Sequence, residues 1–353
     1  MNDGSLLRQV PISDGALAGP VSEPPPREQP CLSSSVYAAL DLGTNNCRLL
    51  IARPVGDGFR VIDSFSRIVR LGEGISTTGR ISEAAIDRTI AALSVCRSKI
   101  ESRNANRLRL VATEACRSAS NGKMFRDRVA SEAGIDLEVI NRQSEATLAM
   151  IGCTPLVDGK ARGAILFDIG GGSTEVVRIE RSADDPGVVR MRGWVSLPFG
   201  VVTLAERFGG RDVTPRSYGE MVGEVARHLA PFVAEHGSDL DGLHLIGTSG
   251  TVTTIAGIHL NLPRYDRRRV DGLWMTDDGI STTIARLLEM SYEERVCSHC
   301  IRRERADLVL PGCAILDAIR QAFPLRRLRV ADRGLREGML VEMMREDGAI
   351  LAG

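Results

Sequence analysis

The sequence predicts an α/β protein made of two related domains, and three observations support this fold class. Short apolar strands alternate with segments of helical periodicity, which is typical of sheets covered by helices. A chain of 353 residues is long enough for two domains. A strand, an aspartate, a glycine turn and a second strand occur in this order twice, first around Asp41 and again around Asp168.

The first half contains the elements of one such domain. The segment 83–103 has Ile86, Ile90 and Leu93 at helical spacing, and Ser82 is a suitable N-cap. A second helix is expected at 123–133. We expect strands at 36–40, 47–52, 59–65, 108–112 and 137–140. Because strands alternate with helices, these strands predict a mainly parallel sheet.

The second half repeats the pattern. Strands are expected at 164–167, 175–179 and 243–246, and helices at 201–207, 219–235, 277–289, 305–322 and 333–345. We therefore expect domains at 35–142 and 143–330, followed by a C-terminal segment, 331–353, whose helix can pack back on the first domain. Since each half opens with a strand–loop–strand hairpin, the active site is expected in the cleft between the domains.

Composition restricts the function classes. Apolar residues make up 43% and charged residues 25%, as in ordinary globular proteins. The 45 acidic residues balance the 45 basic ones, so a polyanion could be attracted only by a local patch, and no nucleic-acid partner is expected. Only three basic residues are lysines (Lys99, Lys123, Lys160). The many arginines suit phosphate recognition, although a GC-rich genome would give the same bias.

The sequence also carries indications of location. No apolar run reaches about 18 residues, so we expect no membrane span. The start lacks a secretory signal, and the scattered cysteines fit reduced thiols, so a cytoplasmic protein is expected. Residues 1–34 are rich in proline, serine and glycine and predict a disordered tail. Cys297 and Cys300 form one isolated pair, a weak motif for metal or redox chemistry.

Three loops carry candidate chemistry. In the loop 41–46, Gly43 permits a tight turn with free N–H groups, and Thr44, Asn45 and Asn46 add polar donors. A plain β-turn uses the same residue types. The second loop places three consecutive glycines between strands, which indicates close approach to a ligand. It comprises Gly170, Gly171, Gly172, Ser173 and Thr174.

Carboxylates flank both loops. Asp41, Asp168 and Glu175 are candidate ligands for Mg²⁺, which prefers oxygen donors and keeps several waters. The third loop, with Gly247, Ser249 and Gly250, lies between a strand and a helix. Helix N-termini bind anions, although small residues also serve in simple packing turns.

Several ordered segments resemble the exopolyphosphatase and guanosine pentaphosphate phosphohydrolase family. They are ALDLGTNNCR (39–48), VATEACRSASN (111–121), FDIGGGSTE (167–175), SLPFGVVT (196–203), GTSGTV (247–252) and VADRGLREG (330–338). The resemblance implies the fold of the actin, Hsp70 and sugar-kinase superfamily, with two duplicated ribonuclease H-like domains. The chain resembles the short form of this family, which lacks the C-terminal HD-like extension. A homodimer is expected from the same resemblance.

The resemblance also implies residue roles. Glu145 matches the catalytic glutamate that orients or deprotonates the attacking water, and Arg117 matches an arginine that holds substrate phosphate. Asp168 and Glu175 match the acidic groups near the metal, and the three glycines match the phosphate loop. Ser144 departs from the pattern, because the family commonly has a second glutamate there. Without the family, Glu145 could equally be an exposed acid in the first turn of a helix.

The sequence therefore predicts a Mg²⁺-dependent exopolyphosphatase, with the 5′-triphosphate of guanosine pentaphosphate (pppGpp) as the alternative substrate. Phosphoryl transfer needs positioning, a cation and an oriented nucleophile, and these residues supply them. Two basic clusters, Arg264, Arg267, Arg268, Arg269 and Arg302, Arg303, Arg305, could line a channel or merely face solvent. An ATP-dependent kinase of a small metabolite and a non-enzymatic nucleotide sensor are the more remote alternatives.

Overall fold

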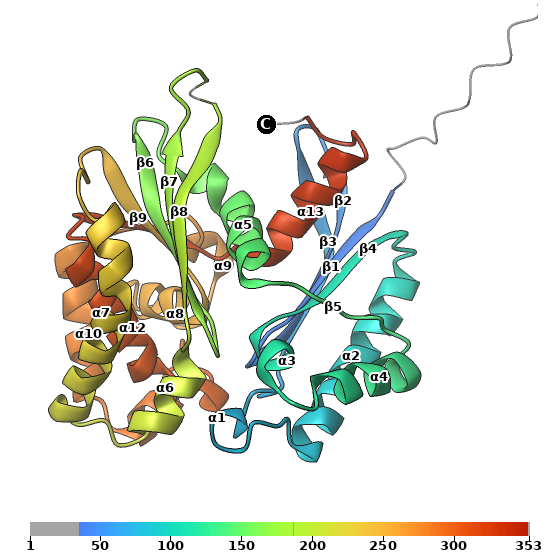
Figure 1. Ribbon diagram of the computed structural model, residues 1–353, viewed down its shortest axis with the longest axis horizontal. Coiled ribbons are helices and arrows are strands. Elements are labelled where there is room, and N and C mark those ends of the chain that lie inside the picture. The colour runs from blue at the N-terminus through green and yellow to red at the C-terminus, as the bar shows by residue number, and fades with distance from the viewer. Residues whose placement is uncertain (1–34, 186, 352–353) are drawn as a thin grey trace, which may run out of the picture.

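The computed structural model describes residues 35–185 and 187–351, and the expected tail 1–34 lies outside the described residues. Two sheets, each covered by helices, form two lobes (Figure 1). The first sheet contains β1 (Tyr37–Leu42), β2 (Asn46–Val55), β3 (Gly58–Ile68), β4 (Arg107–Ala112) and β5 (Glu138–Val139). The second contains β6 (Gly163–Ile169), β7 (Thr174–Arg181), β8 (Val189–Leu197), β9 (Leu243–Thr248), β10 (Trp274–Thr276) and β11 (Arg327–Ala331). The α/β class is confirmed.

The two sheets share one topology. The first has the order β3-β2-β1-β4-β5, and the second has β10-β11-β9-β6-β7-β8. Read from β8 to β11, the second sheet repeats the strand directions of the first, with β10 added at its edge. Even the irregularities agree, because the pairing shifts after Ile51 in β2 and after Arg178 in β7. The duplication expected from the sequence is therefore present in three dimensions.

The expectation of a mainly parallel sheet is wrong. In each lobe the first three strands pair antiparallel, and only the pairings of β1 with β4, β4 with β5, β6 with β9 and β9 with β11 are parallel. Short loops join these first three strands, and a short loop can connect only antiparallel neighbours. The glycine loops are hairpin turns of this kind.

The helices include every one for which the sequence predicts a range, and also several, such as those at 114–118 and 292–297, for which no range is predicted. They are α1 (Ile75–Thr78), α2 (Glu83–Ser102), α3 (Glu114–Ser118), α4 (Gly122–Ala133), α5 (Arg142–Cys153), α6 (Val201–Phe208), α7 (Pro215–His236), α8 (Gly250–His259), α9 (Arg267–Val270), α10 (Asp277–Glu289), α11 (Tyr292–Cys297), α12 (Val309–Ala322) and α13 (Leu335–Glu346). In α2, Ile86, Ile90 and Leu93 are buried, and the Ser82 hydroxyl accepts a hydrogen bond from the Ala85 amide at 3.3 Å. No helix of the described part is long and apolar enough to cross a membrane.

One predicted helix starts later than expected. The segment 305–322 was expected to be helical throughout, but α12 begins at Val309, after a separate 3₁₀ turn at Arg303–Arg305. Pro311 falls in the first turn of α12, where a proline is tolerated because the first amide groups of a helix have no partner inside it. The expected domain limits, 35–142 and 143–330, stay a prediction.

Two helices cross between the lobes, α5 and α13 (Figure 1). A Cβ atom at Gly338 would lie 2.0 Å from the carbonyl oxygen of Leu148, and one at Gly152 would lie 2.1 Å from that of Gly334. Only glycine permits this backbone approach. The same helix, α13, buries Met339 and Leu340 in a cluster with side chains of β1. It thereby links the end of the second lobe to the first sheet.

This crossing predicts that Gly338→Ala destabilises the fold by about 1–3 kcal/mol, the usual cost of overpacking a core. Gly223→Ala in α7 is the matched control, because an added Cβ there meets no atom within 4 Å. Alanine should leave that position neutral or stabilise it by up to about 1 kcal/mol. Urea unfolding measures both. Equal stabilities for the two variants would contradict the assigned role of Gly338.

Candidate active site

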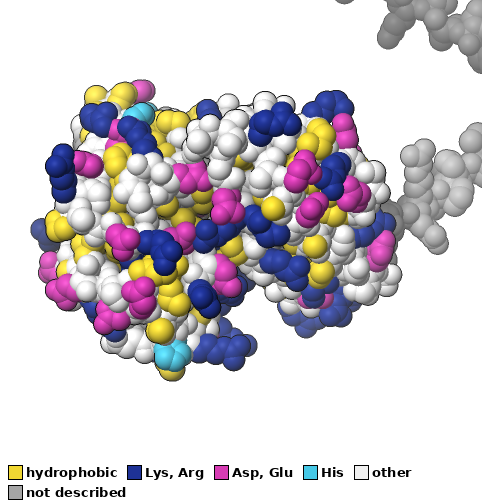
Figure 2. All heavy atoms as spheres, turned by 90° about the horizontal axis from the view of Figure 1, so that it is seen from below, with side chains coloured by type: hydrophobic (Ala, Val, Ile, Leu, Met, Phe, Trp, Pro, Cys, Tyr) yellow, Lys and Arg dark blue, Asp and Glu magenta, His cyan; other side chains and the backbone are white. Residues whose placement is uncertain are grey.

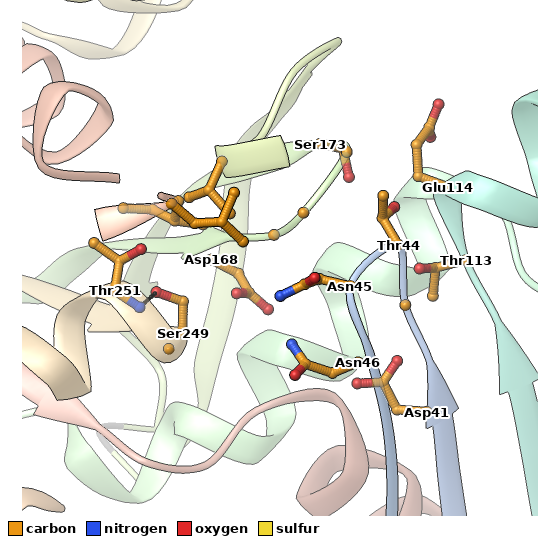
Figure 3. A pocket seen from close by; sticks show the side chains of 18 of the residues that line it. Asp41, Thr44, Asn45, Asn46, Thr113, Glu114, Asp168, Ser173, Ser249 and Thr251 are labelled. Atoms are coloured by element: carbon orange, nitrogen blue, oxygen red, sulfur yellow. Dashed lines mark hydrogen bonds between the residues drawn. The ribbon is translucent and has the colours of Figure 1, made fainter. Parts of the chain in front are cut away.

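A hollow of about 860 Å³, open to solvent, lies between the lobes. All three sequence-predicted loops reach it. Figure 3 shows Asp168 on one side and Asp41, Asn45 and Asn46 on the other, with their side chains directed into the same space. The predicted residues that line it are Asp41, Gly43, Thr44, Asn45, Asn46, Glu145, Asp168, Gly170, Gly171, Gly172, Ser173, Ser249 and Gly250. Arg117, Thr174, Glu175 and Gly247 are not among its lining residues.

The first loop is a hairpin turn closed by one backbone bond. The Gly43 amide donates to the Asn46 carbonyl at 2.9 Å. Within the described part of the chain, the amides of Thr44 and Asn45 have no acceptor, so they are available to an anion in the cleft. Asn45 is 4% exposed, and its Oδ1 atom has no hydrogen-bond partner among the described residues.

The second loop repeats this turn. The Gly170 amide donates to the Ser173 carbonyl at 3.0 Å. Two amides at the start of α6 then hold the loop from behind, since Val201 and Val202 donate to the carbonyls of residues 170 and 171 at 3.0 and 2.9 Å. The amides of Gly171 and Gly172 have no acceptor within residues 35–185 and 187–351. Both domains thus offer the same N–H arrangement.

The two loops lie very close together. A Cβ atom at Gly171 would be 2.9 Å from Cβ of Thr44, and one at Gly172 would be 2.7 Å from Oγ1 of Thr44. Real Cβ atoms do not approach other atoms so closely, so a larger residue would push the lobes apart. The glycines are therefore required for the two phosphate loops to face each other across the cleft.

The third loop contains a strained residue. Ser249 has φ 137°, which is unusual for a residue other than glycine, and such strain is common at functional sites. Its hydroxyl caps α8 by accepting from the amides of Thr251 and Val252 at 3.1 and 3.3 Å. Gly247, by contrast, serves packing, since a Cβ there would lie 2.6 Å from the ring of Phe167.

Glu145 lines the cleft in the first turn of α5 and is held by Arg117. Arg117 Nη1 donates to Glu145 Oε2 at 3.0 Å and to the Ile140 carbonyl at 2.7 Å. Its Nε and Nη2 atoms donate to Oε2 of Glu114 at 3.1 and 2.6 Å. All three nitrogens are thus engaged with protein groups, and a role of Arg117 in holding phosphate stays a prediction.

Burial raises the pKa of four carboxyls at or just below the cleft, those of Asp41, Glu145, Asp168 and Glu175. For Glu145, burial and then the Glu175 carboxylate raise the pKa well above its ordinary value, while Arg117 opposes them. Burial, followed by repulsion from Asp41, raises the pKa of Asp168 to about 6. Burial and the Asp168 carboxylate raise that of Glu175 to about 7. Burial also raises the pKa of Asp41. Carboxyl groups from both lobes are therefore buried around the same cleft.

Glu175 and Thr174 lie below the cleft surface. Glu175 is 2% exposed and accepts a hydrogen bond from the Ser196 hydroxyl at 2.8 Å. Thr174 is buried and donates to the Phe199 carbonyl at 3.0 Å. Among the described residues, no three His, Cys, Asp or Glu side chains are grouped as a metal site, and the binding of Mg²⁺ by Asp41, Asp168 and Glu175 stays a prediction.

Two arginines face these carboxylates. Arg305 Nη2 donates to Asn46 Oδ1 at 3.3 Å, and its guanidinium occupies the space that a Cβ at Gly250 would fill. Within the described part of the chain, Arg305 has no carboxylate partner, and burial together with Arg48 lowers its pKa to about 9. Arg48 also lines the cleft. A buried guanidinium without a carboxylate is suited to a phosphate.

Arg48 was missed by sequence reasoning, although the internal repeat could have found it. In the strand register, Asp41 lies opposite Arg48 in the first hairpin, and Asp168 lies opposite Glu175 in the second. Arg48 is therefore the counterpart of Glu175. Of the two basic clusters, Arg264, Arg267, Arg302 and Arg305 line a second hollow that adjoins the cleft. There Arg267 already pairs with Glu337 at 3.0 Å.

Comparisons with known proteins agree with this geometry. The sequence model of the Ppx/GppA phosphatase family matches residues 50–347. The chain is 29% identical over 317 residues to the guanosine-5'-triphosphate,3'-diphosphate pyrophosphatase of Photobacterium profundum, and the match covers 88% of this chain and 60% of that protein. The chain thus spans only 60% of the length of this curated relative.

Solved structures show the same likeness. A Ppx/GppA family member from Aquifex aeolicus has 30% identity and a TM-score of 0.73, with 89% of this chain and 98% of the other covered. An exopolyphosphatase-like protein has 28% identity and a TM-score of 0.80, with 88% and 99% covered. These likenesses, with the duplicated sheets, confirm the expected actin-like fold. Since the family match extends over most of the chain, this protein belongs to the Ppx/GppA phosphatase family.

Proposed function

We propose that this protein is an exopolyphosphatase that hydrolyses the terminal phosphoanhydride bond of inorganic polyphosphate and releases orthophosphate with the help of Mg²⁺. One observation carries the proposal most directly. Two glycine loops face each other across a cleft that also holds the buried guanidinium of Arg305. Among the residues that the structure describes, two amides of each loop have no acceptor and Arg305 has no carboxylate partner. Amide groups and a guanidinium together match the oxygens of a phosphate chain.

In this proposal Glu145 orients the attacking water and accepts its proton. Its raised pKa is the direction that a general base working near neutrality requires. Arg117 fixes the carboxylate by the 3.0 Å bond, so the water would meet an oxygen of defined position. The loop amides and Arg305 would hold the terminal phosphate and stabilise the charge on its oxygens during transfer.

The residues present fit a bound Mg²⁺. Asp41 and Asp168 both line the cleft, and after burial the Asp41 carboxylate raises the pKa of Asp168, so a cation would relieve this repulsion. Asn45 Oδ1, which has no hydrogen-bond partner among the described residues, offers another oxygen in the cleft. Mg²⁺ commonly takes one or two carboxylates and completes its shell with water and substrate phosphate. When bound, it would neutralise phosphate charge. Glu175 lies below the cleft and would act through the repulsion by which it raises the pKa of Glu145.

Hydrolysis of the 5′-phosphate of pppGpp is the second candidate function. The curated relative from Photobacterium profundum carries a name that specifies this type of nucleotide, and its match covers most of the present chain. Both substrates end in the same phosphoanhydride, so the loops and Glu145 would act alike on them. The difference would lie in the second hollow with its additional arginines.

Glu145→Gln should lower phosphate release by roughly 10²–10⁴-fold, the usual contribution of a general base, because the amide cannot accept a proton. Glu289→Gln at the exposed end of α10 is the matched control and should retain full activity. Malachite-green detection of orthophosphate measures both variants. An active Glu145→Gln enzyme would remove this residue from the reaction.

Substrate choice is tested with defined short polyphosphate, long polyphosphate and pppGpp, each with Mg²⁺ and with EDTA. We expect Mg²⁺-dependent release from polyphosphate at a higher kcat/KM than from pppGpp. A higher kcat/KM for pppGpp than for polyphosphate would make the nucleotide the preferred substrate. If none of the three releases phosphate and ATP is consumed only when a small alcohol is added, the protein is a kinase instead.

Asp168→Asn tests the charge of the cleft through stability. The folded pKa of about 6 lies above the ordinary 3.8, so the stability contribution of Asp168 is full below about pH 4 and is lost as pH rises through 6. At 1.36 kcal/mol per pKa unit, the ionised carboxylate costs up to about 3 kcal/mol at pH 8.

In EDTA at pH 8, we therefore expect Asp168→Asn to be more stable than the wild type by about 1–3 kcal/mol, with the difference shrinking at pH 4.5. Added Mg²⁺ should raise the melting temperature of the wild type more than that of the variant. Asp127→Asn, on the exposed side of α4, is the control. A variant less stable than the wild type at pH 8 would contradict the assigned electrostatics.

A further inference from the structure

The segment 69–79, here called the strap, joins β3 to α2 and contains α1. Its backbone is attached to the first phosphate loop. The amides of Val69 and Arg70 both donate to the Asn45 carbonyl, at 2.9 and 3.1 Å, and the Gly72 amide donates to the Thr44 carbonyl at 2.8 Å. Three backbone hydrogen bonds therefore join the strap and the first loop into one unit.

The side chain of Arg70 connects this unit to the second lobe. Its Nη2 atom donates to both carboxylate oxygens of Asp307, at 2.9 and 3.1 Å, and to the Glu304 carbonyl at 2.9 Å. Arg70 also has φ 47°, a left-handed backbone that a bulky side chain rarely adopts. Such a conformation persists only where the surroundings enforce it. Here the backbone hydrogen bonds to the Asn45 carbonyl hold one side, and the ion pair with Asp307 holds the other.

A second contact joins the strap to the other phosphate loop. Glu206 of α6 accepts hydrogen bonds from the Gly74 amide at 2.8 Å and from the Ser76 hydroxyl. The first amides of α6 hold the second glycine loop, as described above. Figure 2, which views the molecule from below, shows basic and acidic side chains side by side where the lobes meet. The strap thus contacts elements that support both phosphate loops.

Arg305 lies between the two anchors of Arg70 in the sequence, since Glu304 precedes it and Asp307 follows two positions later. Its guanidinium donates to Asn46 in the first loop, so the contacts form a closed ring: first loop, strap, residues 304–307, Arg305 and first loop again. In this ring only the 3.3 Å bond of Arg305 would have to yield to an incoming phosphate.

We propose that Arg70 is a positioning residue, which holds residues 304–307 against the first lobe and thereby presents Arg305 to the terminal phosphate. The inference deepens the proposed function and rests on the phosphate-binding role given there to Arg305. When Arg70 releases Asp307, the cleft opens and Arg305 withdraws from the first loop. Joining of the lobes and completion of the phosphate site are then a single event.

The test compares Arg70→Met, Asp307→Asn, Arg305→Met and the double variant Arg70→Met/Arg305→Met. We expect Arg70→Met and Asp307→Asn each to lower kcat/KM about 10-fold or more. Because Arg70 acts through Arg305, the double variant should be no slower than Arg305→Met by more than about 2-fold. Independent roles would multiply the two losses and would overturn the proposal. If Arg70→Met fails to fold, Asp307→Asn with Arg305→Met forms the same cycle.

A charge reversal provides the second arm. Arg70→Asp/Asp307→Arg restores an ion pair across the cleft, so it should be at least about 3-fold faster than Arg70→Asp alone. Arg128→Met is the matched control and should behave as wild type, because within residues 35–185 and 187–351 the ion pairs of Arg128 are all with carboxylates of the first lobe. A reversal no faster than the single variant would exclude pairing with Asp307 as the cause.

Small-angle scattering separates failure of this proposal from failure of the proposed function, because it needs no turnover. Arg70→Met should have a larger radius of gyration than the wild type, and it should bind tripolyphosphate more weakly in calorimetry. Unchanged radius and affinity would refute the role of Arg70 even if the enzyme is active. If Arg70→Met has a larger radius of gyration but the wild type hydrolyses none of the substrates, the role of the strap is supported and the proposed function is refuted.

Discussion

The close approach of two glycine loops across the cleft is the constraint on which the rest of the structure depends. Each loop belongs to a different sheet, and a single additional carbon at Gly171 or Gly172 would collide with Thr44. The lobes can therefore come together only because these side chains are absent. The crossing of α5 and α13 obeys the same rule at the other contact, through Gly152 and Gly338. Small residues at both contacts bring the two duplicated halves into one site.

This approach determines the electrostatics of the cleft. Asp41 and Asp168 occupy equivalent positions in the two halves, so joining the halves brings two carboxylates toward one space. Burial raises the pKa of both carboxyls, and repulsion from Asp41 raises that of Asp168 further. Arg305 is the opposite case, a buried cation whose pKa is lowered. A bound phosphate would supply the negative charge that Arg305 lacks as a partner among the described residues, and its cation would supply the positive charge for the two carboxylates.

The sequence was sufficient for the fold class, the duplication and most elements, because strand and helix periods and glycine turns are local signals. The family resemblance, carried by local motifs, led to Glu145. The parallel arrangement was overestimated because apolar runs do not reveal strand direction, which depends on the length of the connecting loop. Arg48 ends the segment ALDLGTNNCR, but its position in the cleft opposite Asp41 follows from the register of β2 against β1. Likewise, only tertiary structure could show that Arg70 reaches Asp307.

Arg117 illustrates how a motif residue can serve a site without lining it. Its guanidinium is shared between Glu114 and Glu145, and a second arginine, Arg142, also contacts Glu114 at 3.0 Å. This sharing limits how strongly Arg117 can lower the pKa of Glu145. Burial and the Glu175 carboxylate prevail, and the pKa stays raised. Had Arg117 paired with Glu145 alone, the carboxylate would be a weaker base. Glu114 thus allows one arginine to fix Glu145 in place while Glu145 keeps its affinity for a proton.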